Sequence, residues 1–126
     1  MLQRDYILEL ISQFADAVKQ SLHRAKKDLD PEACQDVERS IGELLELDYN
    51  TALSLSPDSL VTMMILSGIG DSVASYVCYS LMQLAEVYQA RGEEDLAQIR
   101  IAQAKAVSES FNCDLDVVPP EFADEA

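Results

Sequence analysis

The residues that could perform catalysis are few. Gly70-Asp71-Ser72 is a short motif that could present a serine nucleophile, and His23 is the single histidine of the chain. An activated serine needs a base within hydrogen-bond reach and a third group that orients this base. His23 lies far upstream, and the pattern predicts that a helix begins here, so we interpret Asp71 as a helix N-cap. The sequence therefore predicts no catalytic residue and a chain that is not an enzyme.

The cysteines do not form a metal or redox motif. Cys34, Cys78 and Cys113 are odd in number and widely separated, whereas zinc sites and thioredoxin-like motifs need closely spaced pairs. We interpret them as three reduced thiols, which indicates a cytoplasmic protein.

The polar, outward side of a predicted second helix includes Glu38, and three further carboxylates, Asp36, Glu43 and Glu46, share one outer face there. The D-x-D-x-D-G spacing of a calcium loop is absent from the sequence. We interpret this face as solvated and expect no bound metal and no cofactor. A divalent-ion site and a basic partner remain the alternatives for these side chains.

The charge of the chain limits its partners. Its 126 residues include 23 acidic and 9 basic side chains, for a net charge of -14 and a pI near 4.1. A chain this acidic lacks the basic surface that nucleic acids require, so we expect no nucleic-acid partner. Residues 1–30 are neutral overall, while residues 31–60 and the tail from Asp114 hold most of the negative charge. The sequence therefore favours a protein or peptide partner, and a basic one suits the charge best.

The hydrophobic pattern predicts an all-α protein, because apolar residues recur at helical spacing and no segment alternates like a strand. Asp30-Pro31 and Ser56-Pro57 are typical helix starts, with a capping side chain before a first-turn proline. We expect one domain over residues 1–113, a compact bundle of about five helices. The acidic tail, residues 114–126, contains Pro119-Pro120 and no cation, so we expect it to be flexible. The predicted helices cover residues 2–27, 31–46, 58–66, 72–90 and 93–111, with a short helical turn or two within 47–55.

Two apolar features raise questions of membrane contact and assembly. The apolar region 59–85 is interrupted near Gly68 and Gly70, which leaves pieces too short to span a bilayer. Residues 72–85 are apolar on nearly every side, so this helix must be covered all round. With about five helices, one flank lacks a partner within the monomer, and we therefore expect a homodimer. The apolar stripe of the first helix (Tyr6, Ile7, Leu10, Phe14, Val18 and Leu22) is the alternative dimer surface.

The C-terminal hairpin, residues 72–111, resembles a tetratricopeptide repeat. Its small Ala85 and Ala97 would let two antiparallel helices approach closely, and Gly92 falls at the turn between them. Glu109 stands where the repeat has its closing proline, and the preceding 34 residues do not match the pattern. An ordinary αα-hairpin therefore remains the alternative. The positions that match the repeat are Leu81, Leu84, Ala85, Tyr88, Gly92, Ala97 and Ile101.

The whole layout is similar to a bacterial all-helical family described only as a domain of unknown function. The similar segments are Arg4-Asp5-Tyr6-Ile7, Leu47-Asp48-Tyr49 through Leu55-Ser56-Pro57, and the hairpin. This resemblance implies a short all-helical fold, and it carries no activity or functional residue to this chain.

We therefore expect a non-catalytic protein-interaction module, such as an adaptor, a scaffold or a regulatory subunit. The expected binding groove lies between the first helix and the C-terminal hairpin, around Tyr6, Tyr76 and Tyr88. The first alternative is a small-ligand-binding protein or enzyme with a pocket near Tyr76, Tyr79 and Met82. The second alternative is a membrane-surface protein that binds anionic lipid through its first helix, where cations cluster between Lys19 and Lys27.

Overall fold

The computed structural model describes the backbone of residues 2–125 and the side chains of residues 6–122. Within this part of the chain there are helices and no strand, which confirms the all-α prediction. The number of α-helices is six rather than about five, because residues 49–54 form a helix of their own. The helices are α1 (Leu2–Asp28), α2 (Pro31–Leu45), α3 (Tyr49–Ser54), α4 (Pro57–Leu66), α5 (Asp71–Ala90) and α6 (Glu94–Phe111), followed by a short 3-10 helix, η1 (Pro120–Glu125).

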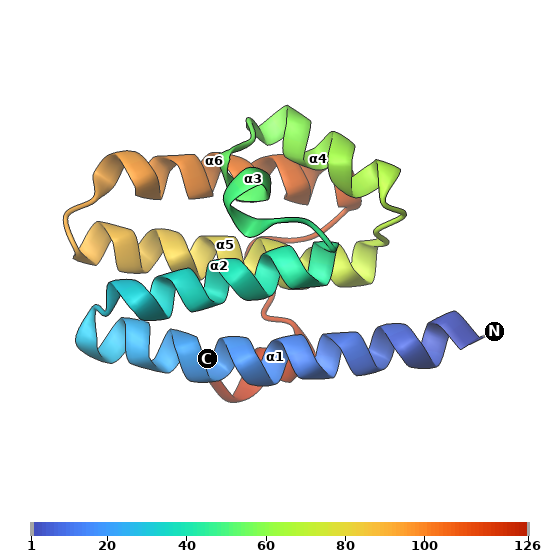
Figure 1. Cartoon of the computed structure of the whole chain (residues 1–126), viewed down its shortest axis with the longest axis horizontal. Coiled ribbons are helices and arrows are strands. Elements are labelled where there is room, and N and C mark those ends of the chain that lie inside the picture. Colours follow the sequence, from blue (N-terminus) through green and yellow to red (C-terminus); the bar gives the residue numbers. More distant parts are fainter. Residues whose placement is uncertain (1, 126) are drawn as a thin grey trace.

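The architecture consists of two antiparallel hairpins that pack on each other. Helices α1 and α2 form the first hairpin and α5 and α6 form the second, with α5 in contact with both helices of the first (Figure 1). The short helices α3 and α4 connect the hairpins, with α3 against α2 and α4 against α6. After α6 the chain returns to α1, where η1 lies (Figure 1).

Local capping signals explain where most helices begin. The backbone N–H of Glu32 donates to Asp30 Oδ1 at 3.0 Å before α2, and the N–H of Ser59 donates to the Ser56 hydroxyl at 3.3 Å before α4. Both predicted caps are thus confirmed. The prediction that Asp71 caps the next helix is wrong by one position: Gly70 is the N-cap of α5, and no side chain caps that end. Asp71 lies in the first turn, where a carboxylate is stabilised by the positive end of the helix dipole.

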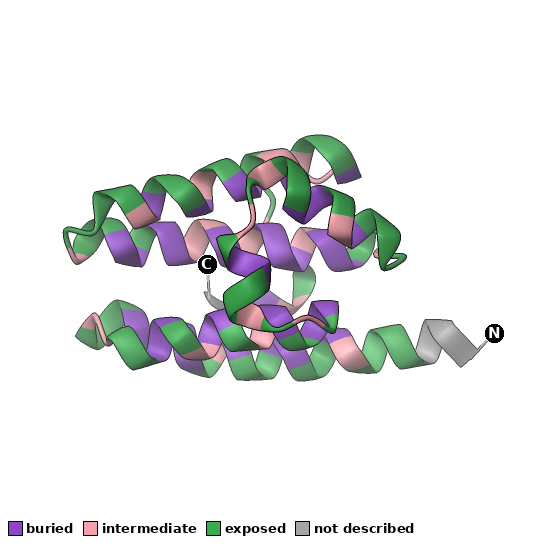
Figure 2. Ribbon diagram, turned by 45° about the horizontal axis from the view of Figure 1, so that its top comes forward, coloured by how far each residue is buried: buried purple, intermediate pink, exposed green. Residues whose placement is uncertain are grey.

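The core runs through the centre of both hairpins, and Figure 2 shows the buried faces turned toward each other. Phe14, Val18 and Leu22 are buried on α1 as predicted, but Tyr6 and Ile7 of the same stripe are exposed. The reason is geometric: the N-terminal end of α1 extends beyond the end of the bundle (Figure 2), so that part of the stripe has no helix to cover it.

Helix α5 is covered on several sides by its own chain, because it contacts α1, α2 and α6. The small side chains of Ala85 and Ala97 are both buried, which suits the predicted close pairing of α5 with α6. Gly92 has a φ of +83° in the turn between these helices, a backbone conformation that glycine adopts without steric cost.

Part of the C-terminal segment packs on the bundle. The Phe122 side chain is 0% exposed and Pro119 is also buried. The ring of Phe122 lies edge-on to Phe14, with 6.4 Å between the ring centroids. These contacts place residues 119–122 against the bundle, while the expected flexibility of the acidic tail stays a prediction.

Candidate functional site

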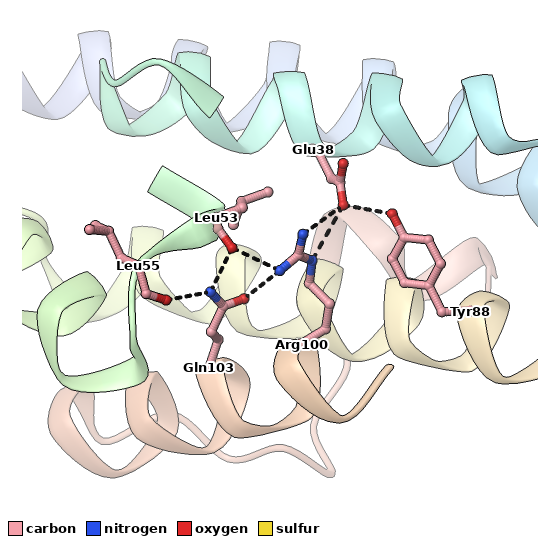
Figure 3. A network of polar contacts seen from close by, with 6 residues as sticks. All are labelled: Glu38, Leu53, Leu55, Tyr88, Arg100 and Gln103. Atoms are coloured by element: carbon pink, nitrogen blue, oxygen red, sulfur yellow. Dashed lines mark hydrogen bonds and ion pairs between the residues drawn. The ribbon is translucent and has the colours of Figure 1, made fainter. Parts of the chain in front are cut away.

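A buried ion pair joins the two hairpins. Arg100 of α6 donates from Nη2 to Glu38 Oε2 of α2 at 2.9 Å, and from Nε to the same oxygen at 3.3 Å (Figure 3). The two side chains are only 7% and 10% exposed. Glu38 was expected on the solvated outer face of its helix, and the structure corrects this. A buried charge needs a partner of opposite charge because its desolvation is costly. Glu38 and Arg100 are each other's partner.

The same cluster of side chains hydrogen-bonds to the C-terminal end of helix α3. Arg100 Nη1 donates to the backbone carbonyl of Leu53 at 3.0 Å, and Gln103 Nε2 donates to the carbonyls of Leu53 and Leu55 at 3.0 and 3.1 Å (Figure 3). Arg100 Nη1 also donates to Gln103 Oε1 at 3.0 Å. The last carbonyls of a helix have no partner within that helix. Two side chains of α6 therefore satisfy the end of α3 and fix its position.

Tyr88 completes the cluster from helix α5. Its hydroxyl donates to Glu38 Oε2 at 2.6 Å. Burial, and then the hydrogen bond to Glu38, raise the pKa of the Tyr88 phenol well above its usual value. The phenol therefore stays protonated near neutral pH and acts as a donor. Glu38 Oε2 accepts from both Tyr88 and Arg100, so this one carboxylate links α2 to α5 and α6.

A surface depression of about 390 Å³ lies over this cluster. Its walls come from α2, from α3 and from the first two turns of α6. Ile99 is 47% exposed in this depression, a large value for an isoleucine in a compact domain. The lining of the depression is thus mostly apolar, and its polar part consists of Asn50, Ser54 and the buried ion pair. Its lining residues are Glu38, Tyr49, Asn50, Leu53, Ser54, Leu96, Ile99 and Arg100.

A second, shallower depression of about 360 Å³ adjoins the first and shares Leu96 with it. It is lined by the start of α6, including Glu93, Glu94 and Asp95. Arg91 binds Glu93 at 2.6 Å, while Glu94 and Asp95 are exposed in the first turn of the helix. An apolar depression and an acidic one therefore lie side by side along α6.

A cation borders the first depression. The guanidinium of Arg39 lies 5.3 Å from the ring centroid of Tyr49, and Arg39 Nη1 binds Asp36 Oδ1 at 2.8 Å. Asp36 also binds Arg24 of α1 at 2.7 Å. The hydrogen bond from Arg24, followed by that from Arg39, lowers the pKa of the Asp36 carboxyl below its usual value. These contacts hold the Tyr49 wall of the depression in place.

The three tyrosines predicted to form a binding groove do not lie together at one surface. Tyr6 is 57% exposed at the projecting end of α1. Tyr76 and Tyr88 are buried on α5. Tyr76 contacts Phe122, and Tyr88 donates a hydrogen bond to Glu38. A partner could reach only Tyr6 without displacing other side chains. Ile7 and Leu8 are exposed beside Tyr6. The homodimer expected from the apolar flank of residues 72–85, or from the stripe of the first helix, stays a prediction.

The alternative pocket near Tyr76, Tyr79 and Met82 is covered by the chain itself. The Phe122 ring stacks on Tyr79 with 4.7 Å between centroids, and it lies tilted against Tyr76 at 5.8 Å. Met82 is half-buried. The aromatic surface that suggested a ligand pocket is therefore in contact with the C-terminal segment.

The sequence pattern did not single out Arg100 and Gln103, and it placed Glu38 on a solvated face. A signal was present: Arg100 and Gln103 follow the buried Ala97 at intervals of three residues, so they occupy the face of α6 that packs against the core. Glu38 follows Cys34 by four residues and precedes Ile41 by three, which places it on the buried face of α2. Polar residues at core positions on two helices indicate a buried pair.

Comparison of the chain with protein-family models, with curated proteins and with solved structures gives no match. Across the described residues, no helix has the length and apolar character needed to cross a membrane. In the same part of the chain, no three His, Cys, Asp or Glu side chains are grouped so that they could hold a metal ion.

Proposed function

We propose that this chain is a non-catalytic protein-interaction module that binds a short segment of a partner protein. The observation that supports the proposal is the pair of adjoining depressions along α6, one apolar around Ile99 and one acidic around Glu94 and Asp95. A segment with an apolar side chain next to one or two basic residues would match both. Its apolar side chain would cover Ile99, and its cations would lie beside the exposed carboxylates.

The charge of the whole molecule supports a basic partner. With a net charge of -14, the chain attracts cationic segments over a distance of about 10 Å at 0.1 M salt. Such steering raises the association rate more than it raises affinity. The affinity would come instead from burying Ile99 of the first depression and Leu96, which lines both depressions.

The floor of the site favours binding over catalysis. Glu38 and Arg100 satisfy each other there, and Tyr88 holds the same carboxylate. A rigid floor reduces the ordering cost of association because the site does not rearrange to accept a ligand. We also infer a cytoplasmic location, since Cys34, Cys78 and Cys113 are free thiols.

A peptide-display selection on the purified, immobilised chain would test the proposal. We expect the selected peptides to be rich in Lys or Arg beside an apolar residue. Their binding should be lost when Ile99→Asp places a charge in the apolar depression, and weakened when Glu94→Lys and Asp95→Lys reverse the acidic one. All three side chains are at the surface, so these variants should keep the fold.

The matched control is Val117→Asp, which places the same charge at another exposed apolar residue, one that is 60% exposed and outside both depressions. It should bind the selected peptides like the unmodified chain. Selected peptides without basic residues, or peptides that bind the Ile99→Asp variant unchanged, would contradict the proposal.

A further inference from the structure

The contact between the C-terminal segment and the bundle has the form of a peptide bound in a slot. Phe14 of α1 and Tyr76 and Tyr79 of α5 surround the Phe122 ring on different sides: edge-on, tilted and stacked. Aromatic rings prefer these arrangements, and they make the contact specific for a ring rather than for any apolar group. We call Phe14, Tyr76 and Tyr79 the aromatic slot.

A polar contact fixes the direction of the bound segment. The Tyr76 hydroxyl donates to Glu121 Oε1, beside the buried Phe122 ring. The backbone N–H of Phe122 donates to the carbonyl of Pro119 at 2.9 Å, which folds residues 119–122 into a compact turn. The slot therefore reads an aromatic residue and the carboxylate directly before it.

The connection to the slot resembles a tether more than a structural element. Residues 112–118 join the end of α6 to the turn, and they include the exposed Asp114, Asp116 and Val117. The turn reaches α1 after this connection (Figure 1). Leu115 and Val118 of the connection are partly buried against the core. The specific contacts of the turn with the slot are those of the Phe122 ring and of Glu121 with the Tyr76 hydroxyl.

The surface around the aromatic slot is close to neutral, so it repels an acidic segment less than the acidic parts of the chain do. Residues 1–30, which include α1, are neutral overall, and residues 72–85 of α5 carry no charged side chain. The tail from Asp114 is acidic, and it lies on the part of the molecule that repels it least. A second acidic segment would meet the same neutral surface.

We propose that the aromatic slot is a peptide-binding site whose resident ligand is this chain's own residues 119–122. When the resident segment leaves, the slot accepts a segment of a partner protein in which a carboxylate directly precedes an aromatic ring. This site is separate from the two depressions along α6 and does not depend on the function proposed for them.

The covalent connection determines the concentration at which a free peptide can compete with residues 119–122 for the slot. A short covalent connection holds its ligand at an effective concentration of about 1 mM or more. A free peptide with the same residues must therefore reach about this concentration before it displaces the resident segment. A full-length chain whose own ring is removed should bind the peptide without this competition.

The test uses full-length chains and a fluorescent peptide with the sequence of residues 114–126. We expect the Phe122→Ala chain to bind this peptide about tenfold or more tightly than the unmodified chain, because its slot is empty. A control peptide with alanine in place of the phenylalanine should not bind either chain. The Val117→Ala chain, altered at an exposed residue of the tether, should behave like the unmodified chain.

A second measurement follows the unmodified chain itself. With 4-fluorophenylalanine at position 122, the fluorine resonance should move from its buried to its solvated position as the unlabelled peptide is added to about the effective concentration of the tether. Circular dichroism gives the fold of each variant. A folded Phe122→Ala chain that does not bind the peptide would overturn the proposal. So would an unfolded one, since residues 119–122 would then be part of the fold and not a ligand.

Discussion

Arg100 and Glu38 lie 62 residues apart in the chain, yet their side chains meet at 2.9 Å inside the molecule. The pair connects the α1–α2 hairpin with the α5–α6 hairpin. Both ions have left water, so their mutual attraction and their neutral hydrogen bonds must offset a large desolvation cost. The pair therefore makes the relative position of the hairpins specific, and removal of either partner should be costly.

Replacement of Arg100 by methionine leaves the Glu38 carboxylate buried without its cation. We expect the free energy of unfolding to fall by about 3–5 kcal/mol, the usual cost of breaking a buried pair on one side. Urea unfolding followed by circular dichroism measures this loss. Arg39→Met is the matched control because Arg39 is exposed, and its effect should be small, since exposed ion pairs contribute little to stability. A loss at Arg100 no larger than the loss at Arg39 would show that the buried pair does not hold the hairpins together.

The Tyr88 hydroxyl should stabilise the fold only through Glu38. Tyr88→Phe removes the donor of the 2.6 Å hydrogen bond and keeps the ring, so we expect a loss of about 1.5–3 kcal/mol, typical of a hydrogen bond to a charged group. In a Glu38→Gln background, the same substitution should cost clearly less. The double-mutant cycle, measured by urea unfolding, gives this coupling. Equal losses in both backgrounds would place the effect of the hydroxyl elsewhere.

Gly42 allows α2 and the start of α3 to approach closely. A Cβ atom at this position would lie 2.7 Å from Tyr49 Cβ and 2.8 Å from the Leu47 carbonyl oxygen. We therefore expect Gly42→Ala to lower the free energy of unfolding by about 1–3 kcal/mol, as overpacking does, although alanine favours helix. Gly70→Ala is the control, because a Cβ there meets no atom within 4 Å. It should cost less than about 1 kcal/mol. Similar melting temperatures for the two variants would contradict the close approach at Gly42.

Local signals in the sequence were sufficient for most of the fold. The Asp30-Pro31 and Ser56-Pro57 pairs marked the starts of α2 and α4 correctly, and Gly92 marked the turn between α5 and α6. These features depend on a few neighbouring residues, so they can be recognised without the tertiary structure. The helix at residues 49–54 was expected only as a turn or two. Its C-terminal carbonyls are satisfied by Arg100 and Gln103, about 50 residues downstream, and a local pattern does not reveal such contacts.

The candidate sites depend on long-range contacts, which composition hides. The acidity of the tail argued for a flexible segment, whereas Phe122 reaches a slot formed by α1 and α5. Tyr76 and Tyr88 were expected in a binding groove between the first helix and the hairpin, but each hydroxyl instead donates to a carboxylate of another element. A single sequence does not distinguish a tyrosine whose hydroxyl binds within the chain from one whose hydroxyl is free to bind another protein.

Stability should fall at alkaline pH because burial raises the pKa of several acidic groups. The pKa of the Cys34 thiol is raised from 9.0 to about 11 and that of Cys78 to about 12, in both cases mainly by burial. Such a group holds its proton more tightly in the folded state than in the unfolded state. Its contribution to stability is therefore complete below pH 9.0, the ordinary thiol value, and is lost as the pH rises toward the folded value.

The measurement is urea unfolding of the full chain at pH 7.5, 9 and about 10.5, in buffers of equal ionic strength. We expect the free energy of unfolding to decrease between the second and third conditions, with Tyr88 adding to the loss because its pKa is also raised. The Cys78→Ala variant has one titrating thiol fewer, so its stability should decrease less steeply over the same interval. Cys113→Ala is the matched control, since Cys113 is only half-buried and its removal should change the slope less. If the Cys78→Ala chain loses stability as steeply as the unmodified one, the buried Cys78 thiol is not a source of the alkaline sensitivity.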